Sequence, residues 1–176
     1  LTLPVALKGS DIIGQAKTGT GKTLGFGIPM VEKVIGPDEE GWEKLRAPGK
    51  PQGLVVVPTR ELAKQVAGDL RDIAAKRSVR VVEVYGGKAY EPQVKELARG
   101  AEIVVGTPGR IIDLGKHRTL DLSHAHTVVL DEADEMLDLG FLEDVEAILS
   151  STPPNRHTML FSATMPAAIR RLSKQY

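Results

Sequence analysis

The 176 residues suit a single domain of ordinary size, and 41% hydrophobic with 26% charged residues is the balance of a globular chain. The 23 basic residues equal the 23 acidic ones, so any attraction to nucleic acid must be local, and the absence of cysteine excludes disulfide scaffolds and cysteine-ligated zinc. No apolar run approaches the ~20 residues that cross a bilayer and the first residues lack a signal-peptide pattern, so we expect a cytoplasmic protein without membrane contact.

Six short apolar runs recur along the chain, and most are rich in β-branched residues without alternation. They cover residues 12–13, 54–57, 79–85, 103–105, 128–130 and 159–161. Such continuous runs are typical of strands buried on both faces of a parallel sheet. Segments 61–75 and 141–149 place apolar residues at helical spacing between these runs. The alternation predicts an α/β fold, with a mainly parallel sheet flanked by helices on both faces.

Residues 36–53 interrupt this alternation. They hold three prolines, four glycines, an acidic run and the only tryptophan. We expect a surface loop without a catalytic role. Trp42 either packs this loop down or docks on a partner.

The turn after the first apolar run has the composition of a phosphate-binding loop. It matches the pattern G-x-x-x-x-G-K-[ST] except for its first glycine, and consists of Ala16, Lys17, Thr18, Gly19, Thr20, Gly21, Lys22 and Thr23. Small residues let consecutive backbone N–H groups surround a phosphate chain at a helix N-terminus. We expect Lys22 to reach the β- and γ-phosphates and the Thr23 hydroxyl to bind Mg²⁺. The alternative is a glycine-rich turn that merely carries Lys-Thr.

The fifth apolar run leads directly into Asp131, Glu132, Ala133 and Asp134. A carboxylate at the tip of a buried strand, beside a phosphate loop, is the second element that a nucleotide hydrolase needs. Asp131 would hold Mg²⁺ directly or in its second shell, and Glu132 would orient and deprotonate the attacking water. The later acidic residues, up to Glu146, are typical of a solvated helix face.

Together these two segments resemble the DEAD-box family of ATP-dependent RNA helicases, which begins its phosphate loop with alanine, as at Ala16. Other stretches resemble further motifs of the family in the expected order: Pro58-Thr59-Arg60-Glu61-Leu62-Ala63, the pair Gly86-Gly87, Thr107-Pro108-Gly109-Arg110, and Ser162-Ala163-Thr164. The resemblance covers nearly the whole chain. It implies one RecA-like ATP-binding domain over residues 1–176, with ATP and Mg²⁺ bound.

The resemblance also implies neighbours for this domain. The family's adenine-reading glutamine motif would lie upstream of Leu1, and a C-terminal RecA-like domain of the same parent chain would follow Tyr176. The arginine finger of the family belongs to that second domain. We therefore expect the isolated domain to be nearly inactive as an ATPase.

The resemblance assigns an RNA-binding role to residues that follow the second, third and fourth predicted strands: Pro58, Thr59, Arg60, Gly86, Gly87, Thr107, Pro108, Gly109 and Arg110. These positions lie past the carboxyl ends of strands, where open α/β sheets bind ligands. Small residues let a phosphodiester backbone approach, and arginines donate charge-assisted bonds. Because no aromatic cluster accompanies them, we expect sequence-independent backbone contacts. Pro108 and Gly109 could instead form only a turn, and Glu61 is expected to hold the shape of its motif.

By resemblance, Ser162 and Thr164 couple the nucleotide state to RNA binding through hydrogen bonds to the segment that ends at Asp134. The alternative is that the two hydroxyls cap the helix near Pro166. The four histidines have no metal-ligand spacing and are expected on the surface: His117, His124, His126 and His157.

Three functions compete. The leading one is an ATP-dependent RNA helicase that couples ATP binding and hydrolysis to RNA unwinding or remodelling. The second is a DNA helicase or translocase of the same superfamily, and the third is a non-enzymatic binding module. The presence of Lys22, Thr23, Asp131 and Glu132 together favours an enzyme.

Overall fold

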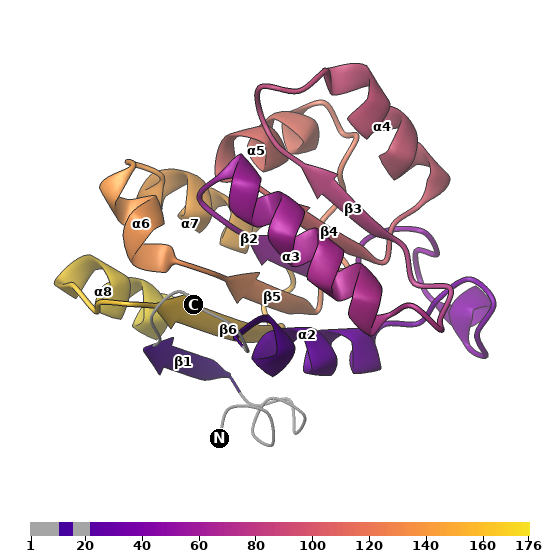
Figure 1. The fold of residues 1–176 in the computed structure, drawn as a ribbon, viewed down its shortest axis with the longest axis horizontal. Coiled ribbons are helices and arrows are strands. Elements are labelled where there is room, and N and C mark those ends of the chain that lie inside the picture. The colour runs from indigo at the N-terminus through magenta and orange to yellow at the C-terminus, as the bar shows by residue number, and fades with distance from the viewer. Residues whose placement is uncertain (1–10, 16–21) are drawn as a thin grey trace.

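Six segments rich in β-branched residues pair side by side in the computed structural model, which describes residues 11–15 and 22–176 (Figure 1). Every pairing is parallel, and the strand order is β1-β6-β5-β2-β4-β3. The strands are β1 (Ile12–Gln15), β2 (Gly53–Val56), β3 (Val81–Val84), β4 (Ile103–Gly106), β5 (Thr127–Leu130) and β6 (His157–Ser162). The six predicted strands are therefore all present, although the third is shorter than predicted.

Helices connect the strands and cover both faces of the sheet (Figure 1). They are α2 (Lys22–Lys33), α3 (Arg60–Ile73), α4 (Tyr90–Arg99), α5 (Pro108–Lys116), α6 (Ala133–Asp138), α7 (Leu142–Ser150) and α8 (Ala167–Gln175), with the short 3-10 helix η1 (Trp42–Lys44). Val55 packs with α2 and α3 on one face, whereas its neighbour Leu54 packs with the other helices on the opposite face. Both faces of each central strand are thus buried, which explains why its sequence is continuously apolar. The predicted α/β class is confirmed.

In the described part of the chain, no helix combines the length and the apolar character needed to traverse a lipid bilayer.

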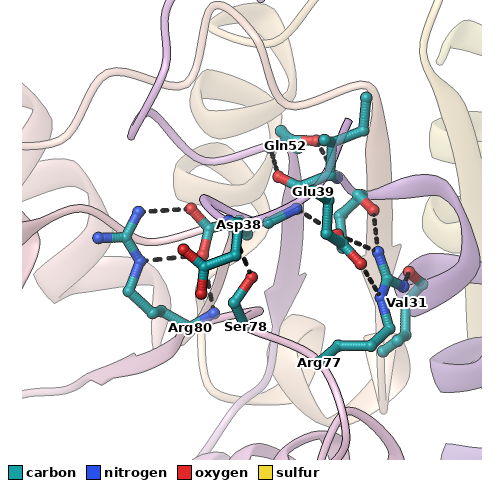
Figure 2. Close-up of polar contacts among 11 residues, drawn as sticks. Val31, Asp38, Glu39, Gln52, Arg77, Ser78 and Arg80 are labelled. Atoms are coloured by element: carbon teal, nitrogen blue, oxygen red, sulfur yellow. Dashed lines mark hydrogen bonds and ion pairs between the residues drawn. The ribbon is translucent and has the colours of Figure 1, made fainter. Parts of the chain in front are cut away.

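The segment between α2 and β2 is tied to its neighbours by polar contacts, as Figure 2 shows. The Arg77 guanidinium binds both carboxylate oxygens of Glu39, at 2.7 and 2.6 Å, and also donates to the carbonyls of Val31 and Val34 at the end of α2. The Gln52 side chain exchanges hydrogen bonds of 2.8 and 2.9 Å with the Ile35 backbone. Most of residues 36–53 form the expected loop, but Gly53 belongs to β2, where it pairs with Ile103 and Thr127.

The prediction that His157 lies on the surface is wrong. This histidine begins β6 opposite Thr127 of β5, so its side chain is only 7% exposed. Its Nδ1 lies 2.8 Å from Lys33 Nζ. An isolated histidine in the sequence gives no sign of whether a strand begins at that residue.

The Arg77–Glu39 pair makes the stability of this loop depend on pH. Hydrogen bonds from Arg77, and then from the Gly36 N–H, lower the pKa of Glu39 from its ordinary 4.5 to about 2. A carboxylate whose pKa falls on folding stabilises the protein above its unfolded pKa, and that contribution is lost as the pH falls toward the folded value. Glu39→Gln should therefore reduce the free energy of unfolding by about 1 kcal/mol at pH 7, the scale of a partly exposed pair.

Urea denaturation at pH 7 and at pH 3 checks this expectation. The difference between Glu39→Gln and the wild type should shrink at the lower pH. The exposed Glu40 provides the matched control, Glu40→Gln, which should change stability little at either pH. An equal difference at both pH values would contradict the role of the Glu39 charge.

Candidate active site

The candidate residues that the structure describes lie at one edge of the sheet, past the carboxyl ends of the strands. The strands are parallel and end at matching levels: Gln15 pairs with Ser162, Leu130 with Leu160, and Val56 with both Leu130 and Gly106. The segments that follow the strands therefore form one rim. The strand order divides this rim into two halves. Lys22 and the segments after β6 and β5 form the half with the nucleotide candidates, and the segments after β2, β4 and β3 form the half with the nucleic-acid candidates.

Lys22 and Asp131 form a buried ion pair in the first half. Lys22 Nζ lies 2.7 Å from Asp131 Oδ1, and the two side chains are 10% and 1% exposed. Lys22 begins α2, and Asp131 directly follows β5, the second neighbour of β1 in the sheet. Burial raises the pKa of Asp131, and the hydrogen bond and charge of Lys22 oppose that rise. Residues far apart in the sequence thus meet at the carboxyl end of the sheet.

The second oxygen of Asp131 fits a bound ligand. Oδ1 also accepts a bond of 3.0 Å from the Glu132 N–H, whereas Oδ2 is buried and has no hydrogen-bond partner among the described residues. A buried oxygen without a partner is costly, so a cation or its bound water would be stabilised here. Thr23 lies in the first turn of α2, one residue from Lys22.

The remaining ligands of a magnesium ion at this position would be phosphate oxygens and water rather than protein side chains. Within residues 11–15 and 22–176, no group of three or more histidines and carboxylates is arranged to hold a metal. Mg²⁺ usually binds through one or two protein oxygens together with substrate phosphates and water. Asp131 and Thr23 fit that mode. The predicted phosphate cradle over residues 16–21 lies outside the described residues.

Glu132 has an unusual backbone and an unusual pKa. Its φ and ψ are 52° and 50°, the left-handed conformation that costs a non-glycine residue about 1–3 kcal/mol. Partial burial raises the pKa of its carboxyl to about 7, and a hydrogen bond with Glu135 and the charge of Glu135 add to the rise. A carboxyl with a pKa near neutrality suits proton transfer to or from a reacting group.

Asp134 connects the acidic segment, residues 131–134, to the end of β6. Its Oδ2 accepts hydrogen bonds from the Thr164 N–H at 3.0 Å and from the Thr164 hydroxyl at 2.9 Å. Its own N–H donates to Ser162 Oγ at 3.1 Å. Burial alone would raise the pKa of Asp134, but its hydrogen bonds, foremost those from Thr164, hold it below its ordinary value.

These are the hydrogen bonds expected between Ser162, Thr164 and the acidic segment. The alternative, that the two hydroxyls cap the following helix, does not hold. The N-cap of α8 is Pro166, and no side chain there makes a capping bond.

The second half of the rim is an open surface. Arg60 begins α3 and is exposed, and Gly86, Gly87 and Gly109 are exposed as well. A side chain at Gly86 or Gly109 would meet no atom within 4 Å, and Gly87 has a φ of +78° that favours glycine. The rings of Pro58 and Pro108 are buried and shape the turns.

Glu61 lies in the first turn of α3, where the helix dipole favours an acidic side chain, and its role in holding the shape of the motif stays a prediction. Its side chain is 78% exposed, and it lies 3.8 Å from its neighbour Arg60. Thr59 also holds the turn, because its Oγ1 accepts a hydrogen bond from the Leu62 N–H at 3.2 Å as the N-cap of α3.

Arg110 has a partner that the sequence did not reveal. Its Nη1 donates to Gln93 Oε1 at 2.9 Å, and Gln93 is buried on α4. A glutamine within a helix is usually exposed, so its residue type gave no signal. Only the packing of α4 beside α5 brings the two side chains together.

The chain is similar to known proteins along its whole length. A family model described as "DEAD/DEAH box helicase" matches residues 1–172. A protein named DEAD-box ATP-dependent RNA helicase CshA from Geobacillus kaustophilus is 53% identical over 99% of this chain, which corresponds to 35% of that relative. An ATP-dependent RNA helicase CshA from Listeria monocytogenes is 49% identical, again over 99% of this chain and 32% of the relative.

Two solved structures are also similar. A DEAD box protein from the hyperthermophile Methanococcus jannaschii superposes with a TM-score of 0.89 at 41% identity, covering 99% of this chain and 45% of that one. A hypothetical ATP-dependent RNA helicase from Sulfolobus tokodaii gives 0.85 at 42% identity, covering 99% and 48%. The chain thus spans about a third of the length of the curated relatives and just under half of these solved chains.

The contribution of the buried Lys22–Asp131 pair to stability can be tested without a bound ligand. Lys22→Met leaves the Asp131 carboxylate buried without its counter-ion, so the free energy of unfolding should fall by about 3 kcal/mol. Adding Asp131→Asn should recover part of that loss, because the uncompensated charge is then removed. Guanidinium denaturation in a chelating buffer measures both variants. The exposed Lys174 provides the control Lys174→Met, and a double variant less stable than Lys22→Met would contradict the ion-pair explanation.

Proposed function

Because the chain belongs to the DEAD/DEAH box helicase family, we propose that it is the N-terminal RecA-like, ATP-binding domain of an ATP-dependent RNA helicase, with residues 1–176 as one domain. The observation that carries the proposal is the division of the rim. A buried Lys22–Asp131 pair beside Glu132 lies on one half, and an open surface with Arg60 and Arg110 lies on the other. A nucleotide and a nucleic-acid backbone would thus bind side by side on adjacent strands.

When ATP binds, its phosphates would replace the Asp131 carboxylate as the partner of Lys22. The Lys22 ammonium group already lies at the end of β5, beside Asp131, and it would bind the β- and γ-phosphates in place of that carboxylate. Asp131, through its unpartnered oxygen, and Thr23 would hold Mg²⁺. Bound magnesium offsets the negative charge of the phosphates. The backbone of residues 16–21 would complete the phosphate cradle.

Glu132 would act as the general base. Water attacks the γ-phosphorus, the bond to the β-phosphate oxygen breaks to release ADP, and the Glu132 carboxylate takes the proton of the water. Partial burial and the neighbouring Glu135 raise the pKa of this carboxyl, and the strained backbone is held by Asp131 on one side and α6 on the other.

The bonds from Asp134 to Ser162 and Thr164 would transmit the state of the nucleotide. They join the segment that carries Glu132 to the end of β6. A movement of the acidic segment on ATP binding would therefore also move residues 162–164. We propose that this link couples nucleotide state to the RNA affinity of the whole enzyme.

RNA would bind along the second half of the rim through its phosphates. Arg60 and Arg110 would donate charge-assisted hydrogen bonds, and Gly86, Gly87 and Gly109 would let the backbone approach. The names of the relatives, all of them RNA helicases, favour RNA over DNA. Comparing RNA- and DNA-stimulated ATPase activity of the full-length parent protein decides between the two. Stimulation by DNA alone would reject the proposal.

Glu132→Gln should separate ATP binding from hydrolysis in the full-length parent. The amide has nearly the same shape but cannot take a proton, so turnover should fall on the order of 10²-fold or more while ATP affinity persists. Steady-state ATPase and nucleotide titration measure the two quantities. Glu143→Gln on the exposed face of α7 is the matched control and should leave both unchanged. Near-normal turnover would show that Glu132 is not the base.

Arg60→Ala should weaken RNA binding by a similar factor for unrelated sequences. A phosphate contact carries no base information. Its loss should make the slope of log binding constant against log salt concentration shallower by about one. Fluorescence anisotropy over a salt series gives affinity and slope together. Arg46→Ala, in the exposed loop before β2, is the control. A loss confined to one sequence would rule out sequence-independent contacts.

The proposed domain division predicts that residues 1–176 alone hydrolyse ATP scarcely at all, even with saturating RNA. An arginine finger supplied by another domain is worth roughly 10³ to 10⁵ in turnover. Steady-state ATPase of the isolated chain beside the full-length parent measures the difference. Comparable turnover by the two would show that one domain is catalytically complete.

A further inference from the structure

Gln93 lies on α4 with only 2% of its surface exposed. Its amide lies between two partners. Nε2 donates to the Tyr85 carbonyl at 3.1 Å, and Oε1 accepts from Arg110 Nη1 at 2.9 Å. Because a carbonyl only accepts and a guanidinium only donates, one orientation of the amide satisfies both. The Tyr85 carbonyl therefore fixes which end of Gln93 faces Arg110.

The other contacts of Arg110 also come from groups without a negative charge. Nη1 and Nη2 lie 3.4 and 3.3 Å from the Lys88 carbonyl, and the guanidinium carbon lies 5.4 Å from the centre of the Tyr90 ring. None of the ion pairs found among the described residues includes Arg110. The side chain is thus oriented by several contacts while its charge remains free to bind an anion.

Two other arginines show the contrast. Arg77 and Arg80, near the amino ends of the strands, each bind a carboxylate at 2.6 Å, Glu39 and Glu102 respectively. A carboxylate partner orients an arginine and also neutralises it. Gln93 orients Arg110 without neutralising it, which is the arrangement that a phosphate-binding arginine needs.

We propose that Gln93 is a positioning residue for RNA binding, which acts by holding the Arg110 guanidinium toward a phosphate of the RNA backbone. This inference rests on the proposed function. An arginine that is already ordered loses less side-chain freedom on binding, so the affinity for the phosphate is higher. The open surface at Gly109, beside Arg110, leaves room for the phosphodiester chain.

A double-mutant cycle on the full-length parent tests this role. The probe is a fluorescein-labelled oligouridylate, bound in the presence of a non-hydrolysable ATP analogue and followed by anisotropy. Gln93→Met keeps the length of the side chain and removes both hydrogen bonds, and should weaken binding roughly fivefold. Arg110→Ala should weaken it on the order of tenfold. If Gln93 acts through Arg110, adding Gln93→Met to Arg110→Ala should cost less than about twofold more.

Two further readouts separate positioning from a general loss of stability. Gln93→Met should lower the salt slope of RNA binding, as Arg110→Ala does, because the same phosphate contact is weakened. The affinity for a fluorescent ADP analogue should stay within about twofold of the wild type, because Gln93 lies on the other half of the rim. Gln175→Met, at the exposed end of α8, is the matched control and should change neither quantity.

Each outcome decides the inference. If the losses of RNA affinity caused by Gln93→Met and Arg110→Ala multiply in the double variant, Gln93 does not act through Arg110. That result would overturn the inference while leaving the RNA-binding proposal intact. An Arg110→Ala variant that binds RNA like the wild type would overturn both.

A second variant covers the case in which Gln93→Met does not fold. Gln93→Glu keeps an acceptor beside Arg110 but neutralises its charge, so RNA binding should again weaken. Wild-type RNA affinity in that variant would overturn the inference.

Discussion

The parallel direction of all six strands is the constraint on which the site depends. Parallel strands with matched ends place every following segment at one edge, whatever its position in the chain. Lys22, Asp131 and Ser162 come from three distant segments and meet because β1, β6 and β5 are adjacent. The segments that carry Arg60, Gly87 and Arg110 lie together on the other half because β2, β4 and β3 are adjacent. If one strand were antiparallel, the segment that follows it would lie at the opposite end of the sheet, and the rim would be interrupted.

The junction between the halves lies at β5 and β2. The Asp131 N–H donates to the Val56 carbonyl at 3.0 Å, so the acidic segment is bonded directly to the strand that leads to Arg60. The Lys22–Asp131 pair lies at this junction, deeply buried, and Glu132 follows with a strained backbone. Such strain persists only where surrounding structure enforces it. The buried strands β5 and β2 beneath supply that support.

The arginines illustrate how the same residue type is used differently at the two ends of the sheet. Near the amino ends, Arg77 and Arg80 hold loops and backbone carbonyls in place, and carboxylates neutralise them. At the rim, Arg110 is held by an amide, a carbonyl and an aromatic ring. The partner therefore decides whether an arginine stabilises the fold or remains available to a ligand. With a net charge of zero, the chain depends on such local arrangements to attract an anion.

The sequence alone determined the fold class and the six strands, and it predicted the residues of the nucleotide half. Continuous β-branched runs can only be buried on both faces, and the phosphate-loop and acidic segments keep their order and spacing along the chain. Tertiary structure decided the strand order, the burial of His157 and Gln93, and the contact between Gln93 and Arg110. These features depend on which side chains meet across distant segments. Local periodicity records whether a residue is buried within its own strand or helix, and it carries no information about the partner on the neighbouring element.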